Sequence, residues 1–141
     1  MLYEDDIVAA VCGYLESRGF TIDGRCRSTE RGDDVASHPS GLRLYIEAKG
    51  EGSAREGSAR HGKVFHSGQV FDVVAKAFYR AAAMLQQASN GERRWAGLAL
   101  PDTPAFRRRV SAIDQSLLRL AMPVFWVQPS RSVTVSQELP L

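Results

Sequence analysis

The spacing of hydrophobic residues changes several times along the chain, and each change marks an expected element. Over residues 2–18 apolar side chains recur every three or four positions, which predicts a helix that ends before Gly19. Over residues 42–49 apolar and polar positions alternate, which predicts a strand with one buried face. Helical spacing returns over residues 69–87, which predicts a second amphipathic helix.

Shorter apolar runs predict the remaining strands, at residues 20–22, 34–36, 95–100 and 124–127, with an edge strand at 133–135. Thr103 followed by Pro104 is typical of a helix start, and we expect one third helix over residues 103–120. Turn residues at 37–41 predict a hairpin between the strands on either side. The order helix, three strands, helix, strand, helix, strand predicts an α/β domain with a mixed sheet flanked by helices. Large aromatic side chains are expected in its core: Tyr79, Trp95, Phe125 and Trp126.

Length and composition favour one domain. With 141 residues, 44% of them hydrophobic, the chain is long enough for a single core and short for two. A net charge of +2 is compatible with a polyanionic partner but is weaker than in many nucleic-acid binders. The start is acidic and no apolar run has membrane-spanning length, so we expect a cytoplasmic protein without membrane contact. Cys12 and Cys26 lack metal-ligand spacing and are expected to be reduced thiols.

Residues at about 50–68 are rich in Gly, Ser and charge, and contain the tandem repeat EGSAR-EGSAR at 51–60. We expect a flexible loop, because loops of this length are usually functional or disordered. Its cations Arg55, Arg60 and Lys63 are candidates for nucleic-acid binding along a phosphate backbone. The alternative is a solvated loop lengthened by duplication of five residues.

Three charged residues lie within segments that otherwise have the pattern of buried strands: Asp34, Glu47 and Lys49. Burial of a charge is costly unless the charge is paired or bound to metal. Glu47 and Lys49 share one face of their strand, and Asp34 lies on the hairpin partner within side-chain reach. The two carboxylates and the Ala48 carbonyl form an all-oxygen set suited to Mg²⁺ or Mn²⁺. Lys49 would orient or deprotonate a water, or stabilise charge on a phosphate. A structural ion-pair cluster is the alternative.

Two further acids bear on this site. Glu4 lies on the apolar side of the first helix, where it completes a metal shell or interacts with the amides of the helix start. Asp33 and Asp34 alternate between faces, so only one of them binds metal. We choose Asp34 because Val35 then begins the apolar side of the strand, and Asp33 stays the other possibility.

Glu4, the segment Gly-Asp-Asp-Val at 32–35 and the segment Tyr-Ile-Glu-Ala-Lys-Gly at 45–50 together resemble the PD-(D/E)XK nuclease superfamily. The resemblance implies a restriction-endonuclease-like αβββαβ core over a single nuclease-like domain, residues 1–141. It implies Mg²⁺-dependent hydrolysis of phosphodiester bonds, with Asp34 and Glu47 as metal ligands, Lys49 as the catalytic lysine and Glu4 as an accessory acid. The proline of the family motif is absent, and Asp33 stands in its place. Family members often place a polar residue at the start of the second helix near the active site, which makes Gln69 a catalytic candidate.

The leading hypothesis is therefore an endonuclease or exonuclease that acts on DNA in repair, recombination, restriction or defence. Lys76 and Arg80 share a helix face with Gln69 and either bind nucleic acid or form a solvated surface. Sequence recognition would come from loops, a homodimer or a partner subunit. A catalytically silent nuclease-fold module that binds DNA or a protein is the alternative, and a metal-binding hydrolase with another substrate is a third hypothesis.

Overall fold

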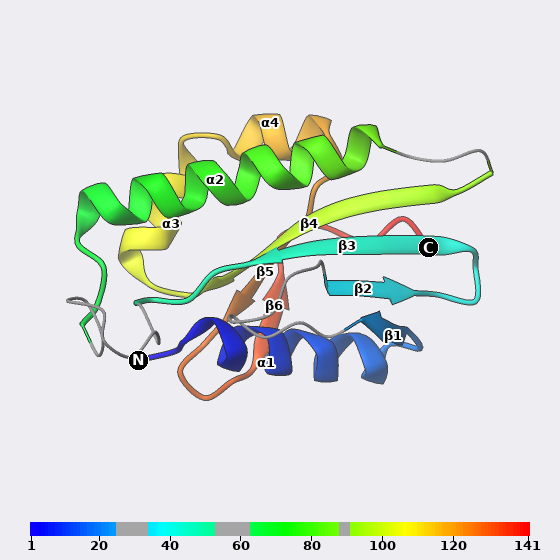
Figure 1. Ribbon diagram of the computed structural model, residues 1–141, viewed down its shortest axis with the longest axis horizontal. Coiled ribbons are helices and arrows are strands. Elements are labelled where there is room, and N and C mark those ends of the chain that lie inside the picture. The colour runs from blue at the N-terminus through cyan, green and yellow to red at the C-terminus, as the bar shows by residue number, and fades with distance from the viewer. Residues whose placement is uncertain (25–33, 53–62, 88–90) are drawn as a thin grey trace.

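Six strands form one mixed sheet in the computed structural model, which describes residues 1–24, 34–52, 63–87 and 91–141 (Figure 1). The strands lie side by side in chain order: β1 (Thr21–Gly24), β2 (Asp34–Ser37), β3 (Leu42–Ala48), β4 (Arg93–Pro101), β5 (Val124–Val127) and β6 (Val133–Val135). β1, β2 and β3 pair antiparallel, β3, β4 and β5 pair parallel, and β6 returns antiparallel to β5. The predicted hairpin of β2 and β3 and the mixed α/β sheet are both confirmed.

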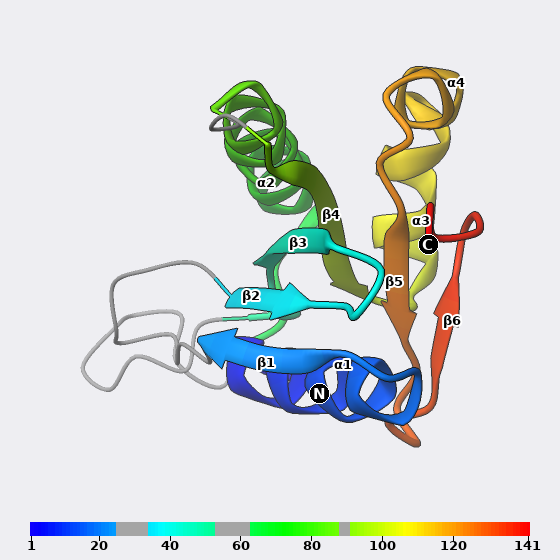
Figure 2. The same ribbon diagram turned by 90° about the vertical axis from the view of Figure 1, so that its right-hand side faces the viewer.

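Helices cover both faces of the sheet (Figure 2). On one face lies α1 (Glu4–Ser17), and on the other lie α2 (Ser67–Gln86), α3 (Pro104–Ser111) and α4 (Asp114–Arg119). Such crossover helices are what parallel pairing of β3, β4 and β5 requires, because each parallel connection has to return over a face of the sheet.

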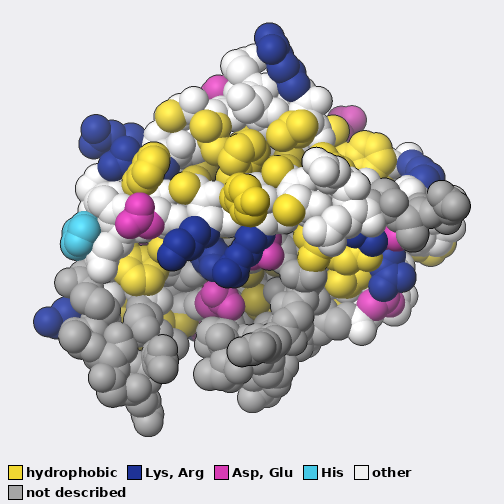
Figure 3. Space-filling view, turned by 45° about the horizontal axis from the view of Figure 1, so that its top comes forward, with side chains coloured by type: hydrophobic (Ala, Val, Ile, Leu, Met, Phe, Trp, Pro, Cys, Tyr) yellow, Lys and Arg dark blue, Asp and Glu magenta, His cyan; other side chains and the backbone are white. Residues whose placement is uncertain are grey.

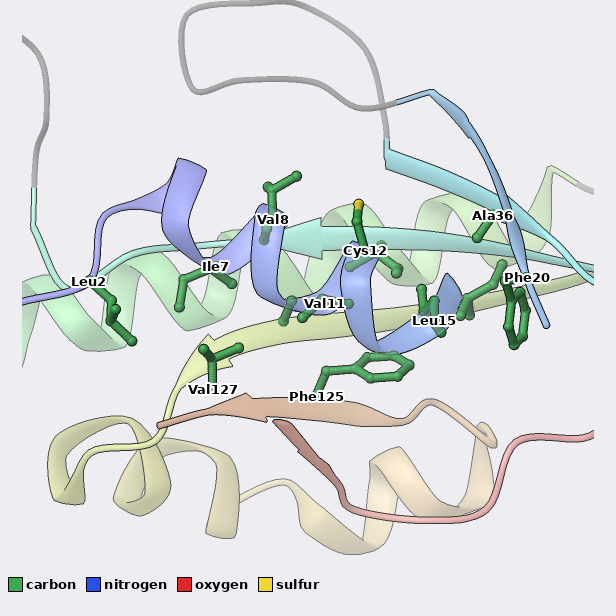
Figure 4. Close-up of a cluster of buried hydrophobic side chains, with 14 of the residues drawn as sticks. Leu2, Ile7, Val8, Val11, Cys12, Leu15, Phe20, Ala36, Phe125 and Val127 are labelled. Carbon is green, nitrogen blue, oxygen red and sulfur yellow. The ribbon is translucent and has the colours of Figure 1, made fainter. Parts of the chain in front are cut away.

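Each face of the sheet has its own hydrophobic cluster. Ile7, Val11 and Leu15 of α1 pack toward Phe125 and Val127 of β5 (Figure 4). The other cluster joins the apolar side of α2 to β4, β5, α3 and α4. From Ala96 to Pro101 the central strand β4 is buried on both faces, which explains why this part of its sequence is continuously apolar rather than alternating.

The chain forms two helices where one was predicted over 103–120. The predicted start is correct, since Thr103 Oγ1 accepts a hydrogen bond from the Phe106 amide at 3.3 Å and Pro104 begins α3. The helix is interrupted at Ile113, whose backbone leaves the helical region with φ −127° and ψ 14°. α4 then restarts in a new direction, and its Leu117 is buried in the same cluster as Phe106. The break therefore allows Leu117 to be buried in the same cluster as Phe106.

The expectation that Tyr79 belongs to the core is wrong, because its side chain is 75% exposed. Ala77 and Ala81 form the buried side of α2, and residue 79 lies about 200° around the helix from each of them. Trp95, Phe125 and Trp126 lie in or against the two clusters, as predicted.

The structure also bears on the expectations for the two cysteines and for membrane-spanning segments. Cys12 is a buried free thiol in α1, whereas Cys26 lies outside the described residues. Among the described helices, none has the length and hydropathy needed to cross a membrane.

Candidate catalytic site

The start of α1 is joined to the chain that follows β3. The Glu51 amide donates to the Leu2 carbonyl at 2.8 Å, and the Glu51 carboxylate accepts from the Leu2 amide at 2.6 Å. Between them the two backbones approach so closely that a Cβ at Gly50 would lie 2.5 Å from the Glu4 nitrogen. A glycine is needed at this position for steric reasons. The contact fixes Glu4 beside the segment that carries Lys49.

Glu4 is half-buried, and its environment is electrostatically unusual. Burial raises the pKa of its carboxyl, the charge of Lys49 opposes this rise, Asp5 adds to it, and Arg80 of α2 also opposes it. The charges of Lys49, at the end of β3, and Arg80, on α2, therefore each reach the Glu4 carboxyl on α1. The alternative role for Glu4, an acceptor for the free amides of the helix start, is filled by Asp6, which accepts from the Tyr3 amide at 2.9 Å.

Glu47 lies on the face of β3 that carries α2. Leu44, Ile46 and Ala48 of the same strand are buried toward α1, and the positions between them are only partly buried on the other face. Glu47 lines a small recess with Ala81 and Met84 of α2. The strand alternation predicted from the sequence is therefore confirmed, with Glu47 on the face opposite Ala48.

At the end of β3, the edge toward β4 is hydrogen-bonded, whereas the edge toward β2 extends past the last described pair of β2 and β3. The Lys49 amide donates to the Ala99 carbonyl at 3.0 Å, so the polar backbone groups of residue 49 face β4. Consecutive residues of a strand direct these groups to opposite sides. The carbonyl of Ala48 therefore faces the β2 flank. The last described pair of β2 and β3 is Asp34 with Ile46, two residues before Ala48.

The oxygen donors of β3 and β2 near this strand end are of the type that hard cations prefer. The Glu47 carboxylate and the Ala48 carbonyl belong to β3, and the backbone of Asp34 begins β2 one register position before Glu47. Carboxylate and carbonyl oxygens are the usual ligands of Mg²⁺ and Mn²⁺. Within the described part of the chain, no group of three or more His, Cys, Asp or Glu side chains is arranged to hold a metal ion.

Gln69 has a structural role that the sequence analysis missed. Its side-chain oxygen accepts from the His66 amide at 3.0 Å, and His66 Nδ1 accepts from the Gln69 amide at 3.3 Å. This reciprocal pair caps the start of α2. The signal was present in the sequence as a polar residue followed three positions later by Gln, but His is not among the common capping residues.

The predicted cations fall into two groups. Lys76 and Arg80 are exposed on α2, and Lys63 is exposed beside the bridge between Gly52 and Val64. Figure 3 shows basic and acidic side chains close together below a strip of hydrophobic ones on this side of the molecule. The other predicted residues of the site and loop lie outside the described residues: Asp33, Arg55 and Arg60.

A second charged cluster, which the sequence analysis did not predict, lies where β4 ends. Arg107 of α3 binds both carboxylate oxygens of Asp102, at 2.7 and 3.0 Å, and its guanidinium stacks on Trp126 at 4.1 Å. Hydrogen bonding from Arg107 lowers the pKa of Asp102. Because the pair joins the end of β4 to α3 through two hydrogen bonds, we interpret it as a support for the turn between them.

Comparison with models of protein families, with curated proteins and with solved structures finds no match for this chain. The functional argument therefore depends on the geometry of the site.

Proposed function

We propose that the protein is a metal-dependent nuclease that hydrolyses phosphodiester bonds in DNA with Mg²⁺ or Mn²⁺. The observation that carries the proposal is that the start of α1, with Glu4, is packed against the segment that follows β3, with Lys49, at the end of a strand that also carries Glu47 and a carbonyl directed away from β4. An acid, an amine and oxygen donors near one strand end are residue types that metal-dependent hydrolysis uses.

The order of elements supports the same proposal. α1, the antiparallel strands β1, β2 and β3, then α2 and the parallel strand β4 follow the αβββαβ order expected for a restriction-endonuclease-like core. In such a core, the end of β3 is where the resemblance places the active site. This agreement of order adds to the argument from charge, because the two are independent.

In the proposed mechanism, which follows the resemblance, Asp34, Glu47 and the Ala48 carbonyl would hold the metal ion. Such an ion would supply Lewis-acid chemistry toward the phosphate and would lower the pKa of a bound water. The Lys49 ammonium positions the attacking water or stabilises negative charge that develops on the phosphate oxygens. Glu4, held near the Lys49 segment by the Gly50 contact, would attract the ammonium through its opposite charge.

Cleavage assays test the proposal. The protein is incubated with supercoiled, linear, single-stranded and branched DNA in Mg²⁺, Mn²⁺ or EDTA, alongside Asp34→Ala, Lys49→Ala and the control Arg119→Ala, which changes an exposed arginine of α4. We expect metal-dependent cleavage that falls by about 10²-fold or more in the first two variants and persists in the control.

Two outcomes would contradict the proposal. Equal cleavage by all variants would show that the activity comes from a contaminant. Tight binding to DNA without cleavage in any metal would instead establish the non-cutting DNA-binding module.

A further inference from the structure

One edge of the sheet is formed by β6, whose outer backbone groups are those of two valines. Among the described strands, β6 is the last in the order and pairs only with β5 (Figure 2). The Ser136 amide donates to the Val124 carbonyl at 3.0 Å, so the backbone groups of residue 136 face β5. Because these groups alternate along a strand, those of Thr134 also face β5. The amides and carbonyls of Val133 and Val135 are therefore directed to the outer edge.

The two edges of the sheet differ in how well they suit a further strand. An open strand edge is a template for pairing with another chain, and proteins commonly block it with charges, proline or bulges. At the β1 edge the register with β2 shifts between Ile22 and Gly24, and Asp23 lies at this shift. β6 has the sequence Val-Thr-Val, pairs regularly with β5 and carries neither charge nor proline. β6 is therefore the edge suited to pairing.

The pattern along β6 is its own complement in an antiparallel pair. If two copies of β6 meet with Thr134 opposite Thr134, Val133 of each copy lies opposite Val135 of the other. Both valines direct their amide and carbonyl toward the facing strand, which is the arrangement of a hydrogen-bonded pair. Opposite residues also project to the same face of the sheet, so valine meets valine. Any extended peptide offers backbone groups, but a second copy of the chain matches the side chains as well by two-fold symmetry.

A groove beside β6 suits the side chains of such a partner strand. The groove has a volume of about 700 Å³ and is lined by β6, the end of α1 and the C-terminal tail. Val133 and Val135 pack against the cluster under α1, so they project to the side of the sheet on which this groove lies. The partner's valines would project to the same side, where Tyr14 and Leu139 offer apolar surface.

The charges at the two ends of β6 also favour an antiparallel partner. Arg131 precedes the strand and Glu138 follows it. The Arg131 side chain is 56% exposed, although one of its nitrogens donates to Asp6 of α1 at 3.0 Å. Glu138 lines the groove. Antiparallel pairing brings the start of one strand to the end of the other, so opposite charges approach each other at both ends of the pair.

We propose that β6 is a homodimerisation edge, at which two copies of this chain join their sheets antiparallel about Thr134. This inference goes beyond the proposed function and does not depend on it. A strand of three residues offers a short contact, so we expect a reversible dimer with a dissociation constant in the micromolar range.

Sedimentation velocity without DNA or metal tests the inference, with the full chain measured from low micromolar to several hundred micromolar concentration. The first variant is Val135→Pro, which removes an outward amide and no bond to β5. We expect this variant to weaken dimerisation by about tenfold or more, because each copy loses a bond to the other. Circular dichroism shows whether the variant is folded.

A charge exchange at Thr134 gives a sharper test, because its side chain is exposed and only this register places it opposite itself. Thr134→Lys and Thr134→Glu each place like charges face to face, and each alone should weaken dimerisation by about tenfold or more. An equimolar mixture of the two should dimerise at least as well as the unaltered protein. The matched control is Thr21→Lys, at an exposed threonine of β1, which leaves the dissociation constant unchanged.

Three outcomes would overturn the inference. A full chain that stays monomeric at every concentration would exclude the dimer. A dimer that Thr134→Lys leaves intact, or that Thr21→Lys weakens equally, would have to form through another surface. Failure of the mixed lysine and glutamate variants to recover dimerisation would exclude the two-fold register about Thr134. None of these results depends on whether the protein cleaves DNA, so the proposed function stands or fails separately.

Discussion

Replacement of Gly50 by alanine tests the contact that holds the candidate site together. The new Cβ would lie 2.5 Å from the Glu4 nitrogen, 2.7 Å from the Tyr3 carbonyl carbon and 2.9 Å from the Tyr3 Cα. These are backbone atoms, so no side-chain rotation relieves the overlap. Ordinary van der Waals contact begins at 3.4 Å. The start of α1 and the segment after β3 therefore have to separate by about 0.9 Å.

The structural cost of this separation is that of local overpacking, about 1–3 kcal/mol. For 141 residues the entropy of unfolding is about 0.3 kcal/mol/K, so we expect the Tm to fall by about 3–10 °C. Cleavage activity should fall further than the loss of folded protein explains, because Glu4 moves away from Lys49. Both effects come from one added methyl group at a buried backbone contact.

Thermal unfolding followed by circular dichroism measures the stability effect, with Gly13→Ala as the matched control. Nothing lies within 4 Å of a Cβ at Gly13, which is inside α1. Alanine is favoured over glycine in a helix by about 0.5–1 kcal/mol, so this variant should raise the Tm. A Tm for Gly50→Ala equal to or above that of the unaltered protein would refute the steric argument, as would equal destabilisation by both substitutions.

Two further predictions concern Glu4 and the central strand. Burial raises the pKa of Glu4 in the folded state above its ordinary 4.5, so the carboxyl favours folding below that pH and loses this contribution as pH rises through the folded-state pKa. Glu4→Gln should therefore raise the Tm at neutral pH, and this gain in Tm should disappear below about pH 4. Differential scanning fluorimetry over that pH range measures the effect. An equal gain in Tm at acid pH would contradict the argument. Leu98→Ala should cost about 2–5 kcal/mol of unfolding free energy in urea titrations, because Leu98 is fully buried in β4. The control Leu118→Ala, at a side chain that is 57% exposed, should cost under about 0.5 kcal/mol. Similar losses for the two variants would contradict the assigned burial.

The sequence predicted best those elements whose signals are local. Alternation over β3 gave both the strand and its buried face, because a shift of one residue would expose Leu44 and bury Glu47. Thr103 and Pro104 gave the start of α3 through their own capping chemistry. The break before α4 was not predictable in this way, since no Gly or Pro marks Ile113. It depends on how Leu117 packs against other elements, and tertiary packing overrides helix propensity there.

The candidate site likewise contains residues that a local pattern predicts and residues whose role depends on distant contacts. Glu47 and Lys49 were recognisable because the strand pattern around them is regular. The importance of Gly50 depends on the start of α1, which lies almost fifty residues earlier in the chain, and no local pattern reports that contact. The effect of the Arg80 charge on the pKa of Glu4 likewise depends on two helices on different faces of the sheet. Gln69 shows the opposite case, in which a residue expected near the active site is engaged in capping its own helix.

The link between Leu2 and Glu51 makes the integrity of the site a separate property from the stability of the fold. It consists of two hydrogen bonds and the burial of Leu2 in the cluster under α1, whereas β4 is held between neighbouring strands and against both buried clusters. Segments with fewer buried contacts open locally at a lower free energy than global unfolding. The amide hydrogens of Leu2 and Glu51 would then exchange with solvent faster than those of β4. In each such opening Glu4 would move away from Lys49 while the sheet stays folded. The fraction of molecules with an assembled candidate site would then depend on the contacts between Leu2 and Glu51 rather than on the core.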